Sequence, residues 1–132
     1  MNDNFTDFDN LGSQSPEINF AGIDASVGLN NVLGDESLFL EILSMFYQDH
    51  SGDGQKLEQA ISSNDYASLK HIVHTLKGVS CSVGAMLLFE KTKALDEAIN
   101  KEMKQDYLPL YQALIPEFDK VMNSISVKII NK

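Results

Sequence analysis

The chain has 132 residues, a length that suits one domain with a single hydrophobic core. Its net charge of −9 at pH 7 argues against a nucleic-acid-binding protein, because a phosphate backbone is bound through clustered lysine and arginine. The apolar runs are short and the acidic N-terminus lacks the basic and apolar parts of a signal peptide, so we expect no membrane span and a cytoplasmic location.

Composition divides the chain into an arm, a domain and a tail. Residues 1–19 are rich in Asn, Asp, Ser and Gly, which predicts a flexible N-terminal arm. Residues 20–126 contain the amphipathic segments of one helical bundle, and the β-branched residues that follow predict a separate C-terminal tail over 127–132. The single cysteine, Cys81, excludes an intrachain disulfide bond.

Capping residues mark the first two helices. Asp24 or Ser26 is expected to cap a short helix that reaches Leu33. Gly34 then ends this helix, and Asp35 caps the next one. Apolar residues repeat at spacings of three and four in the second helix, which predicts a core helix containing Leu38, Phe39, Ile42, Leu43 and Phe46.

The run Ser51-Gly52-Asp53-Gly54 interrupts this pattern before Leu57, Ala60 and Ile61 resume it. The interruption predicts either one long helix kinked at the glycines or two helices. A calcium loop is the alternative interpretation of the Asp-Gly pair, but the alternating oxygen ligands and the closing glutamate of such a loop are absent.

Three more helices are predicted in the second half of the chain. One of the polar residues 63–65 caps a helix over 66–83, which Gly84 ends. The next helix covers about 86–101. The last begins near Gln105 and runs to about Ile125, and we expect Pro116 to kink or split it.

Amphipathic helices joined by short loops can bury their apolar faces only against one another when no strands are present. The predicted fold class is therefore all-α. The predicted architecture is an antiparallel four-helix bundle with a short additional N-terminal helix that covers one end.

The helix over residues 66–83 presents a histidine to solvent. At about 100° per residue, His74 lies roughly 160° from the centre of the apolar stripe, with Lys77 three residues on and Gly78 one turn above. A neutral imidazole is a nucleophile, Lys77 can pair with a phosphate, and the helix-breaking Gly78 leaves room for a partner. The stripe itself contains Leu69, Ile72, Val73, Leu76, Ser80 and Val83.

The run His74-Thr75-Leu76-Lys77-Gly78, followed by the small residues 80–82 and by Gly84-Ala85, resembles the histidine-containing phosphotransfer (HPt) domains of bacterial multistep phosphorelays. The resemblance extends more loosely from about residue 22 to residue 125. The chain departs from many HPt domains at two places. It has Val73 where many of them have alanine, and Leu95-Asp96 where many of them have Leu-Glu. We expect neither departure to affect the chemistry.

The resemblance implies that His74 accepts a phosphoryl group from a receiver-domain phosphoaspartate and passes it to another receiver, with Lys77 stabilising the phosphate. It implies a phosphoryl carrier without an ATP site, kinase activity or cofactor, because the Mg²⁺ ion belongs to the partner receiver. The expected partners are the receiver domain of a hybrid sensor histidine kinase and that of a response regulator, bound by a monomer. The residues expected to contact the partner are Lys70, His71, Gly78 and Cys81.

Charge is distributed unevenly along the sequence. Residues 1–65 carry net −11, residues 66–93 carry net +3, and residues 94–132 carry net −1. The basic segment 66–93 would attract the acidic site of a receiver domain, while the rest of the surface would repel it. The alternative is a chance clustering of solvated lysines.

Three other interpretations remain open at the level of sequence. His74 can be an ordinary surface histidine, since most histidines are. His71 and His74 have a spacing that can share a metal ion, but no third ligand is nearby and Lys70 and Lys77 would repel a cation, so we expect no metal site. The competing function is a helical adaptor that binds receiver domains without carrying phosphate.

Overall fold

The structure is a computed structural model that describes residues 18–131, and in this range it contains α-helices and no β-strand. The all-α prediction is therefore confirmed. The α-helices are α1 (Ala25–Asn30), α2 (Glu36–His50), α3 (Asp53–Ser62), α4 (Tyr66–Val83), α5 (Met86–Asn100) and α6 (Tyr107–Ile125). A 3₁₀ turn (Lys104–Asp106) precedes α6, and a π-type turn (Ser126–Ile130) follows it.

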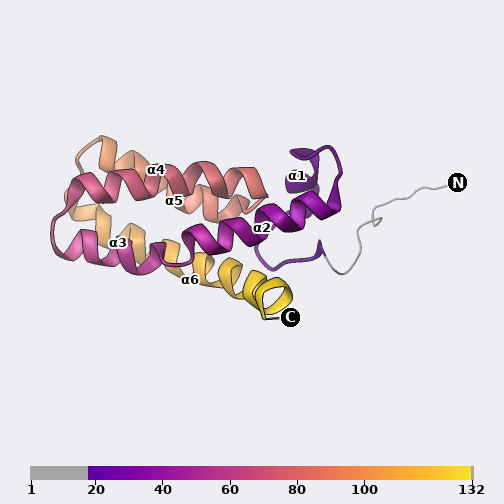
Figure 1. Ribbon diagram of the computed structural model, residues 1–132. Helices are drawn as coiled ribbons and strands as arrows, with labels where there is room; N and C mark the ends of the chain where they lie inside the picture. Colours follow the sequence, from indigo (N-terminus) through magenta and orange to yellow (C-terminus); the bar gives the residue numbers. More distant parts are fainter. Residues whose placement is uncertain (1–17, 132) are drawn as a thin grey trace, which may run out of the picture.

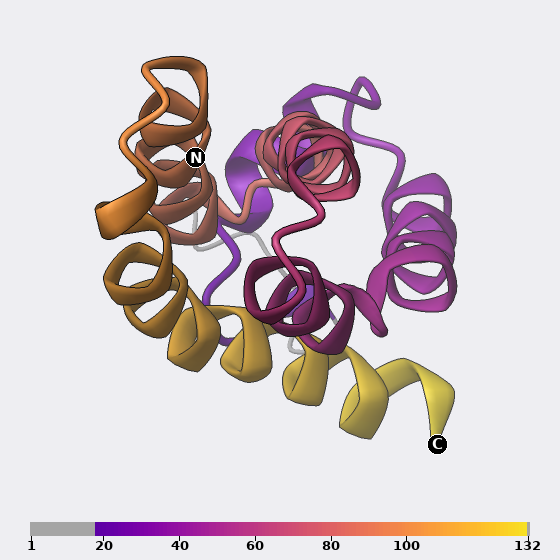
Figure 2. The same ribbon diagram turned by 90° about the vertical axis from the view of Figure 1, so that its left-hand side faces the viewer.

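The helices form an antiparallel bundle whose four sides are α2 with α3, then α4, α5 and α6 (Figure 1). Helix α4 packs against α5 and α3, and α6 closes the bundle by packing against α5, α3 and α2, as the end-on view shows (Figure 2). The short α1 lies at the end of the bundle where α4 stops. There the Asp24 amide donates to the Gly84 carbonyl at 2.8 Å. The predicted architecture, including the end-covering helix, is confirmed.

The break between α2 and α3 shows that this segment forms two helices. Gly54, in the first turn of α3, brings the α3 backbone close to α6: a Cβ at this position would lie 3.0 Å from Ile115 Cδ1 and 3.2 Å from Phe118 Cε2. The hydroxyl of Tyr111 donates to the Gly54 carbonyl at 3.1 Å. Gly54 therefore allows close packing of α3 on α6.

Both predicted boundaries of the bundle need correction. Ile18 is fully buried and Phe20 is nearly so, which means that the packed chain begins before residue 20. The rest of the predicted arm, residues 1–17, lies outside the described residues. At the other end, the predicted tail 127–132 starts as a continuation of α6 in the π-type turn, where Ile129 packs against the core and Lys128 donates to the Asn19 carbonyl.

Pro116 does not split the last helix. Helix α6 runs without interruption from Tyr107 to Ile125, with Pro116 exposed inside it. Proline removes the amide that would bond to the carbonyl four residues earlier. That carbonyl belongs to Gln112, an exposed residue, so water can replace the lost donor. Of the two predicted outcomes, a kink or a split, the split does not occur, because the unpaired carbonyl is exposed.

Candidate functional site

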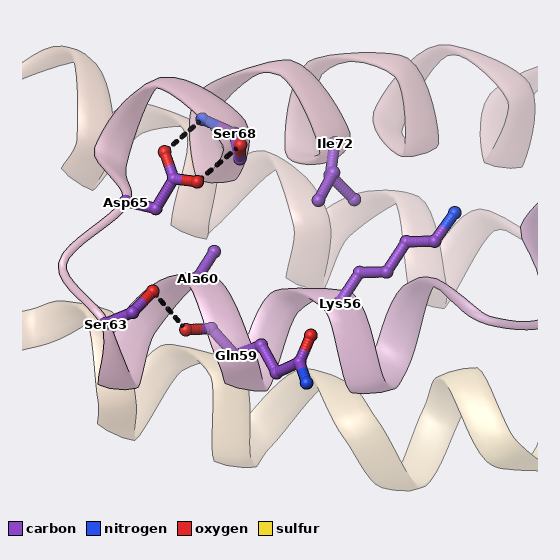
Figure 3. A pocket seen from close by; sticks show the side chains of 7 residues that line it. All are labelled: Lys56, Gln59, Ala60, Ser63, Asp65, Ser68 and Ile72. Atoms are coloured by element: carbon purple, nitrogen blue, oxygen red, sulfur yellow. Dashed lines mark hydrogen bonds between the residues drawn. The ribbon is translucent and has the colours of Figure 1, made fainter.

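Helix α4 begins and ends where its sequence predicts. At its start, the Asp65 carboxylate accepts from the Ser68 hydroxyl at 2.7 Å and from the Ser68 amide at 3.2 Å (Figure 3). These two bonds, the hydroxyl bond first, lower the pKa of Asp65. At its end, Gly84 has φ +88°, and a Cβ there would lie 2.3 Å from the Asp24 carbonyl oxygen. Only glycine fits this close approach of α1.

The apolar stripe of α4 is confirmed as the face that packs into the bundle. Its side chains are buried, except Ile72, which is partly buried against the same core. The buried residues are Leu69, Val73, Leu76, Ser80 and Val83. The helix is therefore held in one rotational orientation, because turning it would expose this stripe to water. A side chain on the opposite face then has a rigid support.

His74 lies on that opposite face and is exposed. No side chain in the described part of the chain bonds to its ring. Gly78, one turn further on, is also exposed, and a Cβ built on it would meet nothing within 4 Å. The space beside the histidine ring is thus open to a partner molecule on the side where Gly78 lies.

The other predicted partner-contact residues surround His74 on the same helix. Lys70 and His71 are exposed one turn before it, and Cys81 is partly exposed two turns after it. Lys70, Lys77 and Cys81 lie on the side of His74 that faces α5, whereas His71 and Gly78 lie on the side that faces α2 and α3. The predicted set therefore forms one continuous surface along α4.

Lys77 has a partner that the sequence analysis missed. Its ammonium donates to the Asp96 carboxylate of α5 at 2.8 Å, with 28% of the Lys77 side chain and 6% of the Asp96 side chain exposed. The Leu95-Asp96 pair, noted in the sequence only as a departure from many HPt domains, thus supplies the carboxylate that binds the lysine of the motif. The signal available in sequence was the position of Asp96 beside Leu95, a residue of the buried stripe of α5.

Two grooves adjoin each other between α3 and α4. The first, of about 180 Å³, is lined by His71 and Thr75, the neighbours of His74, and by the His50–Asp53 pair, whose ring nitrogen and carboxylate are 2.9 Å apart. The second continues toward the start of α4 (Figure 3). Lys56 lines both, extending from α3 beneath Ile72, although no pattern singled it out in the sequence.

A more apolar groove separates α2 from the second half of α4. It has a volume of about 170 Å³, and Met45, which is 54% exposed, lines it together with Ile42 and Val79. Leu38, also exposed, continues the apolar strip along α2, since residues 38, 42 and 45 share one helical face. An exposed apolar strip of this kind is typical of a surface that binds another protein.

No cluster of three or more potential metal ligands is found among residues 18–131, and no helix in that range is long and apolar enough to cross a membrane.

The profile of the Hpt domain family matches residues 41–126, which is most of the chain and includes the whole of α4. The fold is similar to the crystal structure of the HPT domain from the Hpt sensor hybrid histidine kinase from Shewanella, with a TM-score of 0.76 and 21% sequence identity over 84% of this chain and 96% of that chain. None of the curated proteins matches the chain by sequence. The chain belongs to the Hpt domain family and functions in histidine phosphotransfer within phosphorelays.

Proposed function

We propose that His74 is the phosphoryl-carrying residue and that it accepts the group from a receiver-domain phosphoaspartate and passes it to the aspartate of another receiver. The observation that carries this proposal is the exposed, unbonded ring of His74 beside the open turn at Gly78. The two other histidines are less suitable. His50 is engaged by Asp53, and His71 lines the groove between α3 and α4.

The proposed step needs only groups that a rigid helix can present. An unprotonated nitrogen of the His74 ring attacks the phosphorus, a P–N bond forms, and the P–O bond to the receiver aspartate breaks as its carboxylate leaves. The Mg²⁺ that neutralises the transferring group would be held by the receiver. The chain itself would supply the nucleophile, its position and a nearby ammonium, and would act as a carrier rather than a kinase.

Docking of the receiver would use two kinds of surface around His74. The apolar strip formed by Leu38, Ile42, Met45 and Val79 offers area that loses water on binding. The lysines of α4 offer positive charge toward the acidic site of a receiver. Both surfaces include residues of α4, the helix that carries His74, so one partner domain could cover them together while its aspartate faces the ring.

The test is transfer from a receiver carrying a radiolabelled phosphoaspartate. The native chain should take up the label and His74→Gln should take up none, while thermal melting shows that the variant stays folded, since an exposed substitution changes stability by about 0.5 kcal/mol or less. The comparison variant is His71→Gln, an exposed histidine on the same helix. Because His71 is an expected partner contact, this variant can bind the receiver more weakly, but at saturating receiver it should still take up label. Label on the His74→Gln protein, or loss of uptake in His71→Gln instead, would refute the assignment. Binding without any uptake by the native chain would favour a receiver-binding adaptor.

A further inference from the structure

The bond between Lys77 and Asp96 joins the phosphotransfer helix α4 to α5. It is 2.8 Å long and connects a largely buried carboxylate to an ammonium that is still partly exposed. Asp96 is one of the few charged residues buried in the described part of the chain. A buried carboxylate that lost its only cation would be left without compensation, which is strongly unfavourable. Lys77 is therefore held by Asp96 rather than free to sample the helix surface.

An ammonium has three N–H donors, and the bond to Asp96 uses one of them. The remaining two donors are available because the Lys77 side chain is partly exposed. Lys77 follows His74 by three residues, a spacing at which side chains on a helix are neighbours. Lys77 can thus keep its bond to Asp96 and still donate to a phosphoryl group on the His74 ring. A lysine fixed in this way loses less side-chain entropy when the phosphoryl group arrives.

We propose that Asp96 is a positioning residue for phosphotransfer: it holds the Lys77 ammonium where its remaining N–H groups meet the phosphoryl group on His74. This inference rests on the assignment of His74 as the phosphoryl carrier. Asp96 does not touch the phosphoryl group and acts only through Lys77. The bond spans two helices, so it also ties the position of the ammonium to the packing of α4 on α5.

The experiment compares single-turnover transfer from a phosphorylated receiver in the native chain, Lys77→Ala, Asp96→Asn and the double variant. Asp96→Asn keeps the shape of the side chain and removes its charge. It should slow the transfer step by about tenfold, which corresponds to one charge-assisted hydrogen bond, and leave the receiver concentration at half-maximal rate nearly unchanged. The double variant should be no slower than Lys77→Ala, because both changes remove the same function.

Two further variants separate positioning from general damage to the fold. Glu97→Gln removes an exposed carboxylate next to Asp96 on α5 and should transfer at the native rate. Asp96→Glu keeps the charge and should restore most of the rate lost in Asp96→Asn. A native rate in a folded Asp96→Asn protein, or effects of Asp96→Asn and Lys77→Ala that multiply in the double variant, would overturn the proposal. These outcomes are distinguishable from a failure of the His74 assignment, in which the native chain itself takes up no phosphate on His74.

Discussion

If His74 carries the phosphoryl group, as we propose, Gly78 is the residue at which helix stability and phosphotransfer would make opposite demands. It lies in the interior of α4, where glycine costs about 1 kcal/mol relative to alanine. The surrounding space is empty, so packing gives no reason for the missing side chain. A longer side chain at this position would cover the turn before it, which is the turn that carries His74. We therefore expect the glycine to keep the approach to the ring open and to lower the stability of the helix.

We predict that Gly78→Ala raises the free energy of unfolding by up to about 1 kcal/mol, through better helix propensity and a less flexible unfolded chain. Gly78→Leu should fold at least as well as the native chain but exchange phosphate far more slowly with a receiver. Thermal melts and transfer kinetics measured on the same two proteins test both statements.

The matched control is Ala67→Leu, which places the same side chain on an exposed site of α4 two turns before His74. This variant should transfer at close to the native rate. Normal transfer by Gly78→Leu would show that steric clearance is not the role of the glycine. Lost stability in Gly78→Ala would show that the glycine serves packing after all.

For single residues, the sequence predicts which way a side chain points better than it predicts what that side chain bonds to. The helical period places His74 opposite the buried stripe, and the structure agrees, because the direction of a side chain depends only on its own helix. The same period could not show that Lys77 bonds to Asp96, which is nineteen residues away on another helix. The groove lined by Lys56 and the His50–Asp53 pair was missed for the same reason, since it forms between α3 and α4.

Helix α4 depends on its capping residue for the stability of its first turn. The Asp65 carboxylate accepts two bonds from Ser68, and these bonds lower its pKa. A carboxyl group whose pKa is lower in the folded state than in the unfolded state stabilises the fold above its unfolded pKa of about 3.9. This contribution is lost as the pH falls through the lower folded value. The cap of the phosphotransfer helix should therefore weaken in acid.

We predict that Asp65→Asn makes the stability of the protein less sensitive to pH below about 4, because asparagine also caps helices but does not titrate in this range. Urea unfolding at neutral pH and near pH 3 measures the difference. Glu41→Gln, which removes an exposed carboxylate in the middle of α2, is the control and should leave the acid dependence of the native protein largely unchanged. Identical acid dependence in the native chain and Asp65→Asn would contradict the role assigned to the cap.

At the scale of elements, local signals predicted most helix boundaries, and tertiary contacts decided the others. Asp35, Asp65 and Gly84 mark helix ends because their capping bonds form within a few residues. The prediction placed Ile18 in the arm because its neighbours in the sequence are mostly polar. In the structure this single apolar side chain is buried in the core. Pro116 was expected to kink or split α6. The helix continues through it, because the carbonyl that loses its donor belongs to the exposed Gln112.

The whole molecule combines an acidic surface with one basic segment. The sequence carries net −9, but the segment that contains α4 and the first part of α5 carries net +3. We expect an acidic partner to be attracted by the exposed lysines of this segment, such as Lys70, and repelled by the acidic segments, while the apolar strip on α2 would supply contact area that does not depend on charge. The lysines would then orient the partner, and the apolar side chains would contribute most to the tightness of binding.

We predict that added salt weakens receiver binding, since exposed charges are screened over about 10 Å at 0.1 M ionic strength. Lys70→Ala should weaken binding at low salt and reduce its salt dependence. Met45→Ala should weaken binding at every salt concentration and leave the salt dependence as it is. Titration calorimetry with a receiver domain at two salt concentrations measures both effects.

Lys101→Ala, an exposed lysine outside the basic segment, is the control and should behave as the native chain does. Binding that is insensitive to salt would contradict electrostatic steering by the basic segment.

The most direct test of the central claim is to locate the phosphoryl group on the native chain after incubation with a phosphorylated receiver, by ³¹P NMR and mass spectrometry of the intact phosphoprotein. We expect one phosphoramidate, on His74, which is lost in acid and retained in base. A phosphoryl group on any other residue, or a bond that survives acid, would contradict this expectation.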